Sequence, residues 1–316
     1  MVGCVIVHNH QIIGEGYHKA YGDHHAEVMA INSVTEDALL PESTVYVNLE
    51  PCAHYGKTPP CADLIISRKI KKVVISNTDP HEKVAGKGIE KMVASGIEVV
   101  SGVLEKEGHE LNKQFFTFHQ KKRPYIVLKW AETSDGFMGR FSDDASSKQI
   151  SNALSNRFVH ELRAQSGAIL IGTNTAVQDN PSLTTRLVDG KNPLRVVLDS
   201  KARIPESHTV FTDGNETIII GPSRPNSRVE YIDIPNDAQY WPSVMRTLYQ
   251  RNILQVLVEG GRRIHEQLID QGLWDEAIVI TSDAKWENGV RSPILNNTKL
   301  RSFTLDNDTI THYLNR

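Results

Sequence analysis

Cysteine is scarce in this sequence, at three residues among 316. A small, odd number of thiols does not suit a disulfide framework and is typical of proteins in a reducing cytosol. The first ten residues, MVGCVIVHNH, contain neither a basic segment nor a signal-peptide cleavage site. The sequence therefore favours a cytoplasmic protein over an extracellular scaffold held together by disulfides.

Long apolar runs and an excess of basic residues are also missing. No apolar segment approaches the roughly 20 residues that a helix needs to cross a bilayer, so we expect no membrane association. The formal net charge is −3, whereas proteins that bind nucleic acid usually carry a positive excess. Hydrophobic residues make up 39% of the chain, which is enough for packed cores, and the length predicts about two domains.

Strand-like and helix-like patterns alternate along the chain, which predicts the α/β fold class. In the first half we expect strands at 2–8, 11–18, 44–51, 72–76 and 97–102. Helices are expected from His25, over 61–70, after the glycine-rich turn at 86–88, and as one charged helix over 105–120. A basic segment and Pro124 end this last helix, so we place the domain boundary there, with domains at 1–121 and 122–316.

The second half continues the same alternation. A strand is expected at 125–133, and a helix runs through 156–165. Four further strands have continuous apolar runs, which predicts burial on both faces as in a parallel sheet. These four strands are expected at 168–172, 194–200, 216–221 and 254–261.

The most informative motif is His24-His25-Ala26-Glu27, followed by Pro51-Cys52 and then by Cys61. The order H-x-E, P-C and C is typical of zinc nucleobase deaminases. In such a site one imidazole and two thiolates bind Zn²⁺ and leave a fourth position for water, whose pKa the metal lowers towards about 7. A carboxylate that is not a ligand then moves protons, and Glu27 lies in the first turn of the expected helix.

Each of these residues also has a plainer interpretation. His24 and His25 suit a polar surface, and Cys52 and Cys61 suit inert buried thiols, although their combined order favours a metal site. Cys4 lies within an apolar strand and is interpreted as a small core residue. Cys52 and Cys61 are separated by eight residues, whereas the common deaminase pattern has two.

The segment PCAHYGKTPPC (51–61) resembles the deaminase domain of the bifunctional deaminase/reductase family of riboflavin biosynthesis, the RibD family. The resemblance implies a cytidine-deaminase-like, three-layer fold for residues 1–121. It implies His25, Cys52 and Cys61 as zinc ligands and Glu27 as the proton shuttle. It also places four residues at positions that touch the substrate: His18, His54, Lys57 and Asp79. Without the resemblance, His54 and Lys57 are interpreted as members of a solvated loop.

Members of that family usually carry a helix and a Pro-Asn-Pro ahead of the strand VGCVIV, and the Asn is expected to hold the pyrimidine. The sequence given starts directly on that strand. Two alternatives to an active deaminase therefore remain. One is a reductase whose zinc module is structural or inactive. The other is an RNA-binding deaminase-like module, which the acidic net charge, the Cys52–Cys61 spacing and the whole second half disfavour.

The second half has no G-x-G-x-x-G fingerprint of a dinucleotide-binding fold. It does contain VLVEGGRRIHEQL (256–268), a pattern of strand, Gly-Gly turn and helix. Gly260 and Gly261 allow a ligand to approach the backbone, and the free N–H groups of a helix start suit a pyrophosphate. Taken alone, the same pattern is often only a turn.

Further segments resemble the reductase domain of the same family. They are KWAETSDGFMGR (129–140), 162–186, PLRVVLDS (193–200) and the Gly-Gly turn. This reductase domain is similar in fold to dihydrofolate reductase. The resemblance implies NADPH as the cofactor. Substrate positions fall on Ser147, Arg163, Leu183, Arg186 and Glu259. Cofactor positions fall on Ala131, Gln149, Thr175, Asp179, Ser200, Gly261, Arg262, Arg263, Ile264, His265, Glu266 and Gln267.

Residues of this second group have plainer interpretations too. Arg163 suits an exposed helix charge, and Asp179 suits a turn before Asn-Pro. Lys129 and Asp135 lie at and just beyond the end of a strand near the expected cleft, where they are candidates to assist the reaction.

The whole chain is thus predicted to be a bifunctional enzyme that acts on a small phosphoribosylaminopyrimidine. It would deaminate 2,5-diamino-6-(5-phosphoribosylamino)pyrimidin-4(3H)-one with zinc. It would then reduce the ribosyl group with NADPH to give 5-amino-6-(5-phosphoribitylamino)uracil. The resemblance also implies a homo-oligomer.

Overall fold

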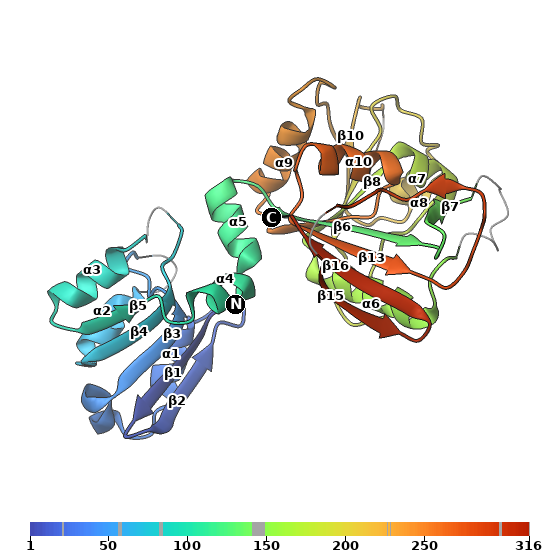
Figure 1. Cartoon of the computed structure of the whole chain (residues 1–316). Coiled ribbons are helices and arrows are strands. Elements are labelled where there is room, and N and C mark those ends of the chain that lie inside the picture. The colour runs from blue at the N-terminus through green and yellow to red at the C-terminus, as the bar shows by residue number, and fades with distance from the viewer. Residues whose placement is uncertain are drawn as a thin grey trace. The chain divides into compact units, whose positions relative to one another are not determined.

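The computed structural model describes residues 1–20, 22–55, 59–81, 85–140, 149–225, 227, 229–296 and 299–315. The chain divides into two compact units, Met1–Lys121 and Lys122–Arg316 (Figure 1). Two residues named above, Lys57 and Ser147, lie outside the described residues. None of the helices in the described part combines the length and apolarity that crossing a bilayer requires.

The first unit is built on a five-stranded sheet in the order β2-β1-β3-β4-β5. The strands are β1 (Gly3–His8), β2 (Gln11–Tyr17), β3 (Thr44–Leu49), β4 (Lys72–Asn77) and β5 (Glu98–Ser101). The first two form an antiparallel hairpin, β1 is antiparallel to β3, and β3, β4 and β5 are parallel. The helices are α1 (Ala26–Ser33), the 3₁₀ helix η1 (Asp37–Glu42), α2 (Cys61–Ser67), α3 (Lys87–Ala94), α4 (Glu105–Leu111) and α5 (Lys113–Lys121).

One helix of this unit lies unusually close to the sheet. Alternate residues of the strands, such as Ile6, Val47 and Ile75, form a buried core to which α1 also contributes. A side chain at Gly16 of β2 would place its Cβ only 2.4 Å from the backbone nitrogen of Ala30. Glycine at this position therefore lets α1 rest directly on the hairpin, which fixes the start of α1 against the sheet.

The single helix expected over 105–120 is wrong, because the structure has two helices that meet at Asn112. This residue leaves the helical conformation, with φ −118° and ψ 25°. Its side chain is buried, and its amide nitrogen donates a hydrogen bond of 2.9 Å to the Met1 carbonyl oxygen. The side chain at the bend between the two helices is thus bonded to the first residue of the chain.

The second unit contains a nine-stranded sheet in the order β11-β10-β9-β8-β12-β6-β13-β16-β15. These strands are β6 (Tyr125–Glu132), β8 (Ala168–Gly172), β9 (Leu194–Leu198), β10 (Thr217–Ile220), β11 (Glu230–Ile232), β12 (Gln255–Val258), β13 (Glu276–Thr281), β15 (Lys299–Leu305) and β16 (Asp308–Leu314). A separate ribbon pairs β7 (Phe137–Gly139) with β14 (Val290–Arg291). The helices are α6 (Ala153–Gln165), α7 (Thr173–Asp179), α8 (Thr209–Thr212), α9 (Tyr240–Gln250) and α10 (Arg262–Asp270).

The strands from β11 to β13 are all parallel, and β15 and β16 add an antiparallel hairpin. Every residue of β8, β9 and β10 is buried, and so are three of the four in β12, which confirms the burial expected from their apolar runs. Parallel strands present their carboxyl ends at one edge of a sheet. The segments after β6, β8, β12 and β13 therefore gather at this edge, where the site described below is found.

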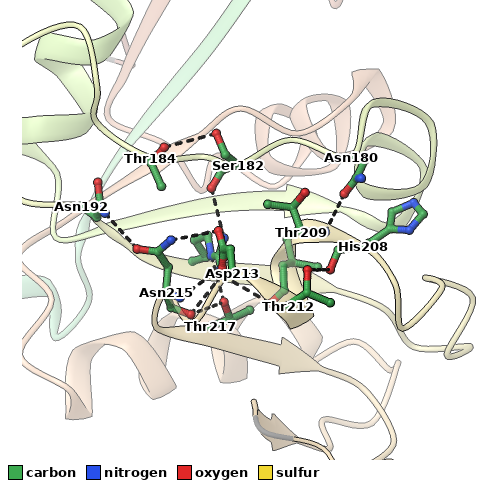
Figure 2. A network of polar contacts seen from close by, with 12 residues as sticks. Asn180, Ser182, Thr184, Asn192, His208, Thr209, Thr212, Asp213, Asn215 and Thr217 are labelled. Atoms are coloured by element: carbon green, nitrogen blue, oxygen red, sulfur yellow. Dashed lines mark hydrogen bonds and ion pairs between the residues drawn. The ribbon is translucent and has the colours of Figure 1, made fainter.

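An ion pair with a buried guanidinium stabilises the opposite end of the strands, where β9 and β10 begin; Figure 2 shows Asp213, Ser182 and Thr217 of this network. Arg195 of β9 is 1% exposed, and its guanidinium donates to both carboxylate oxygens of Asp213 at 2.8 and 2.7 Å. It also donates to the Thr217 hydroxyl at 2.9 Å and to the Ser182 carbonyl at 3.1 Å. The guanidinium thus ties together three stretches of chain that are separate in sequence.

We expect Arg195→Met to lower the free energy of unfolding of this unit by about 3–5 kcal/mol, because it removes a buried guanidinium that donates to Asp213, to Thr217 and to backbone carbonyls. The matched control is Arg251→Met, which removes an exposed pair with Glu230 and should cost less than about 1 kcal/mol. Urea unfolding followed by tryptophan fluorescence measures both variants, because all four tryptophans lie in the second unit. Equal losses in the two variants would contradict this assignment.

Candidate active sites

The first unit brings His25, Cys52 and Cys61 together. His25 caps the start of α1, Cys61 is the first residue of α2, and Cys52 lies in the segment that follows β3. The His25 Nδ1 atom lies 3.6 Å from the Cys52 Sγ atom and 3.3 Å from the Cys61 Sγ atom. All three ligand atoms lie within 4.8 Å of one another.

This spacing fits a tetrahedral zinc ion. Zn–S bonds of about 2.3 Å and Zn–N bonds of about 2.0–2.1 Å place neighbouring ligand atoms roughly 3.6–3.8 Å apart. The observed separations match that requirement with little adjustment. The backbone N–H of Cys61 also donates to the Cys52 Sγ atom at 3.3 Å, a bond typical of a thiolate. Hydrogen bonds from the Cys61 thiol, the His25 ring and this N–H lower the pKa of Cys52 to about 4 despite its burial.

Glu27 lies beside the metal group without belonging to it. It is in the first turn of α1 and is 3% exposed. Burial raises the pKa of its carboxyl to about 7, against the opposing effect of its own backbone N–H. The group is therefore able both to accept and to release a proton near neutral pH, which is what a general acid–base catalyst requires.

The other residues predicted to touch a substrate are distributed around this group. The ring of His18 lies edge-on to that of His25, with centroids 5.3 Å apart. His54 is exposed, and its ring is nearly parallel to that of His81 at 6.5 Å. Asp79 is partly buried, which raises the pKa of its carboxyl, and it accepts the His81 N–H at 2.8 Å. Their roles as ligand contacts stay predictions.

The sequence analysis missed Glu50, a carboxylate that is 3% exposed and fixes the segment leading into α3. Its two oxygens accept the backbone N–H groups of Asp79, Gly86, Gly88 and Ile89 at 3.2, 3.0, 2.9 and 3.3 Å. The segment passes so close that a Cβ at Gly88 would lie 2.0 Å from the Pro51 oxygen. The one sequence feature that could have pointed to Glu50 is its position directly before the Pro51-Cys52 motif.

The second unit contains a cavity of about 620 Å³ at the carboxyl edge of its sheet. It is lined by seven of the residues expected to bind cofactor or substrate: Ala131, Gln149, Thr175, Asp179, Glu259, Gly261 and Arg262. Lys129 lines it as well, together with three residues that the sequence analysis did not single out: Met138, Arg140 and Trp286. A volume of this size suits a ligand larger than a single small metabolite.

A buried charge cluster lies at the wall of this cavity. Arg163 donates two parallel hydrogen bonds to Glu259, at 2.8 and 2.9 Å, and the Lys129 ammonium lies 3.6 Å from the same carboxylate. Burial alone would raise the pKa of Glu259, but the charges of Lys129 and Arg163 outweigh it and lower the value to about 2. Burial lowers the pKa of Lys129. Arg163 is thus a buried partner of Glu259, unlike the exposed helix charge that its plainer interpretation assumed.

The remaining substrate positions lie on one segment next to Arg163. Leu183 is buried with φ +58°, and the following Thr184 carbonyl accepts from Arg163 at 3.3 Å. Arg186 is exposed and donates to the Ser182 hydroxyl at 2.7 Å. The predicted cofactor position Ser200 lies elsewhere, after the end of β9 at the carboxyl edge of the sheet.

Helix α10 places its predicted cofactor residues in two different environments. The side chains of Ile264 and His265 are buried in the core, where His265 Nε2 lies 3.1 Å from the Val258 oxygen. The Gln267 oxygen accepts from the indole of Trp241 at 3.3 Å. In contrast, Arg263 is exposed, and Arg262 pairs with Glu266 at 2.6 Å. Because the side chains of Ile264 and His265 are buried, only their backbone at the start of α10 could contact a cofactor. The cofactor roles of the α10 residues stay predictions.

We expect Cys52→Ser and Cys61→Ser to lose zinc, because a hydroxyl at neutral pH is a poor replacement for a thiolate ligand. The matched control is Cys4→Ser, since the Cys4 thiol is buried and does not belong to the metal group, so its loss should leave the zinc content unchanged. Metal analysis of purified protein should find about one zinc per wild-type chain. Retention of zinc in both ligand variants would contradict the assignment.

We expect Glu50→Gln to loosen the backbone at Asp79, Gly86, Gly88 and Ile89, because the amide loses the charge that strengthens their four hydrogen bonds. Amide hydrogen exchange at Gly86, Gly88 and Ile89 should become at least about tenfold faster, while the zinc content stays unchanged. Glu90→Gln, on the exposed side of α3, is the control and should leave exchange as in the wild type. Unchanged exchange in Glu50→Gln would show that the carboxylate does not hold this segment.

Comparison with known proteins matches both units to described domains. Residues 1–77 match the model of the cytidine and deoxycytidylate deaminase zinc-binding region. Residues 124–282 match the model of the RibD C-terminal domain. The riboflavin biosynthesis protein RibD of Aquifex aeolicus is 39% identical over 285 residues, which cover 88% of this chain and 79% of that protein. The RibD protein of Bacillus amyloliquefaciens is 40% identical over 287 residues, covering 87% and 76%.

Solved structures agree with these relatives. Acinetobacter baumannii RibD superposes with a TM-score of 0.89 at 32% identity, covering 99% of this chain and 91% of that one. The deaminase/reductase of Thermotoga maritima superposes with a TM-score of 0.87 at 36% identity, with the same coverage. The α/β fold with a deaminase-like first unit and a reductase second unit is thereby confirmed. This chain belongs to the RibD family of bifunctional deaminase–reductases in riboflavin biosynthesis.

Proposed function

We propose that this enzyme performs two successive steps on one phosphoribosylaminopyrimidine. The first is hydrolytic deamination of 2,5-diamino-6-(5-phosphoribosylamino)pyrimidin-4(3H)-one. The second is reduction of the ribosyl group, which gives 5-amino-6-(5-phosphoribitylamino)uracil. The Thermotoga maritima relative is described as a diaminohydroxyphosphoribosylaminopyrimidine deaminase and a 5-amino-6-(5-phosphoribosylamino)uracil reductase. The observation that carries the proposal here is the buried Glu27 carboxyl beside the three-residue metal group.

The deaminase domain binds zinc and the reductase domain uses NADPH. Zinc, when bound by His25, Cys52 and Cys61, lowers the pKa of a water molecule at its open position. Glu27 accepts the proton of that water and delivers it to the departing amine, so that C–NH₂ and water become C=O and ammonia. Burial raises the pKa of this carboxyl, which favours uptake of the proton that it then passes on.

For the second step, the cavity would hold NADPH, which would supply a hydride. The ring-opened ribosylamine, an imine, gains this hydride at C1′ and a proton at the adjacent nitrogen. Lys129 is the buried cation of the cavity wall, and burial lowers its pKa towards the range of a proton donor. Glu259 and Arg163 hold the ammonium in place through the contacts described above. We assign Lys129 as the donor and its two partners as positioning residues.

We assign recognition of the substrate phosphate to Arg186. Arg163 is committed to Glu259 by two hydrogen bonds, whereas Arg186 is exposed and donates only to Ser182 among the bonds found for its guanidinium in the described residues. A planar guanidinium binds phosphate through paired donors. His18, His54, Lys57, Asp79, Ser147 and Leu183 complete the proposed substrate contacts.

We further propose a cytoplasmic homo-oligomer that binds neither nucleic acid nor membranes. None of the three cysteines forms a disulfide, and the net charge is −3. Both properties support a role in a reducing compartment with a small-molecule substrate.

We expect Glu27→Gln to lower ammonia release from the diamino substrate by roughly 10²–10⁴-fold, because the amide cannot carry the proton. Zinc content and NADPH consumption with the deaminated substrate should stay as in the wild type. Glu15→Gln, on the exposed side of β2, is the matched control. Ammonia and NADPH are followed separately in both proteins.

Ammonia release that survives Glu27→Gln would remove the proposed proton shuttle. A wild-type enzyme that consumes NADPH with the deaminated substrate, but releases no ammonia from the diamino one, would instead select a reductase with an inactive zinc module.

A further inference from the structure

Trp286 is distinct among the tryptophans of this chain. The other three, Trp130, Trp241 and Trp274, are buried in the core of the second unit. Trp286 is only partly buried and lines the cavity together with Ala131, Gln149 and Gly261. The functional assignments above leave this aromatic surface without a role.

The cavity wall that contains Trp286 is held by the carboxylate of Asp135. Its oxygens accept the backbone N–H groups of Trp286 at 3.1 Å and Glu287 at 2.7 Å, and the Thr133 hydroxyl at 2.6 Å. These bonds, led by that of Thr133, lower the pKa of Asp135 to about 2. The carboxylate is therefore ionised and fully engaged by the protein. Although the sequence made Asp135 a candidate to assist the reaction, its geometry is that of a positioning residue.

Further contacts fix the same wall from both sides. The Arg291 guanidinium donates to the Asp135 carbonyl at 2.9 Å, and the β7–β14 ribbon pairs the two segments. The Arg140 guanidinium lies 4.6 Å from the centre of the Trp286 ring, a cation–π contact that orients the indole. Trp286 is thus presented to the cavity in a defined orientation before any ligand binds.

The order of strands indicates which end of a dinucleotide lies next to Trp286. The residue follows β13, and β13 is the neighbour of β6, which contributes Lys129 and Ala131 to the cavity. Ser200 follows β9. In the sheet order β6 is directly next to β13, whereas β9 is the fourth strand from β13. The hydride must leave the ring that is nearest the Lys129–Glu259 group. That ring therefore lies at the β6–β13 end, which is the end that Trp286 occupies.

We propose that Trp286 is a further cofactor-contacting residue, whose indole packs against the dihydronicotinamide ring of NADPH, and that Asp135 positions it. The inference rests on the proposed assignment of this cavity to the cofactor. Stacking of a planar ring on an aromatic side chain is typically worth enough to change binding by about tenfold.

The dissociation constant of NADPH, measured by the fluorescence of its nicotinamide, tests the contact. Trp286→Ala should weaken binding about tenfold or more, and Trp286→Phe, which keeps a ring face, should stay within about threefold of the wild type. Adenosine 2′,5′-bisphosphate, which lacks nicotinamide, should bind both variants as it binds the wild type. Tyr231→Ala, on β11 at the opposite edge of the sheet, is the control and should change neither constant.

The role of Asp135 is tested by a double-mutant cycle. Asp135→Asn should weaken NADPH binding in the wild-type background, because its amide cannot accept all three donors. It should have no further effect in the Trp286→Ala background, and binding of adenosine 2′,5′-bisphosphate should stay unchanged. An effect of equal size in both backgrounds would show that Asp135 does not act through Trp286.

The outcomes separate this inference from the assignment of the cavity. If wild-type enzyme binds NADPH and Trp286→Ala binds it equally well, the contact with Trp286 is wrong and the cavity assignment stands. If Trp286→Ala weakens NADPH and adenosine 2′,5′-bisphosphate alike, the indole does not contact nicotinamide. If Gly261 variants with a bulky side chain leave NADPH binding intact, the cavity assignment itself fails.

Discussion

A buried carboxylate has to be hydrogen-bonded and paired, or else it becomes neutral, and this constraint shapes both units of the enzyme. Glu50 is satisfied by four backbone N–H groups, and Glu259 by Arg163 and Lys129. Each of these carboxylates fixes a segment that is distant in sequence and that borders a site. These carboxylates therefore act mainly to position other groups, because their oxygen atoms already accept hydrogen bonds from the protein.

Glu27 meets the same constraint in the other way. It is as buried as Glu50, yet its pKa is raised to about 7, whereas that of Glu259 is lowered to about 2. A group with a pKa near neutral exchanges protons readily, while a group with a pKa near 2 stays charged and orients its partners. The difference in environment thus assigns proton transfer to Glu27 and electrostatic positioning to Glu259, although both are buried carboxylates near a proposed reaction centre.

Local patterns predicted the parts of the structure that depend on local chemistry. The H-x-E and P-C motifs were enough to bring His25 and Cys52 into one candidate site, and apolar runs were enough to predict burial of β8 and β9. The break at Asn112 was missed; the side chain there bonds to Met1 at the other end of the unit, a contact that no local pattern reveals. The hairpin of β15 and β16 was missed as well, since β15 is largely exposed and has no apolar signature.

Residues just after a strand show why the sequence alone leaves some chemistry open. Lys129 and Asp135 both lie near the end of β6, and both are ionisable. The sequence pattern alone therefore makes them equally good candidates to assist the reaction. In the structure, the Asp135 carboxylate accepts hydrogen bonds from backbone N–H groups 151 and 152 residues away, while the Lys129 ammonium lies at the cavity wall. The deciding property is how many donors and acceptors of each group the protein already uses. Because those partners come from distant segments, only the folded chain distinguishes a residue that reacts from one that holds another in place.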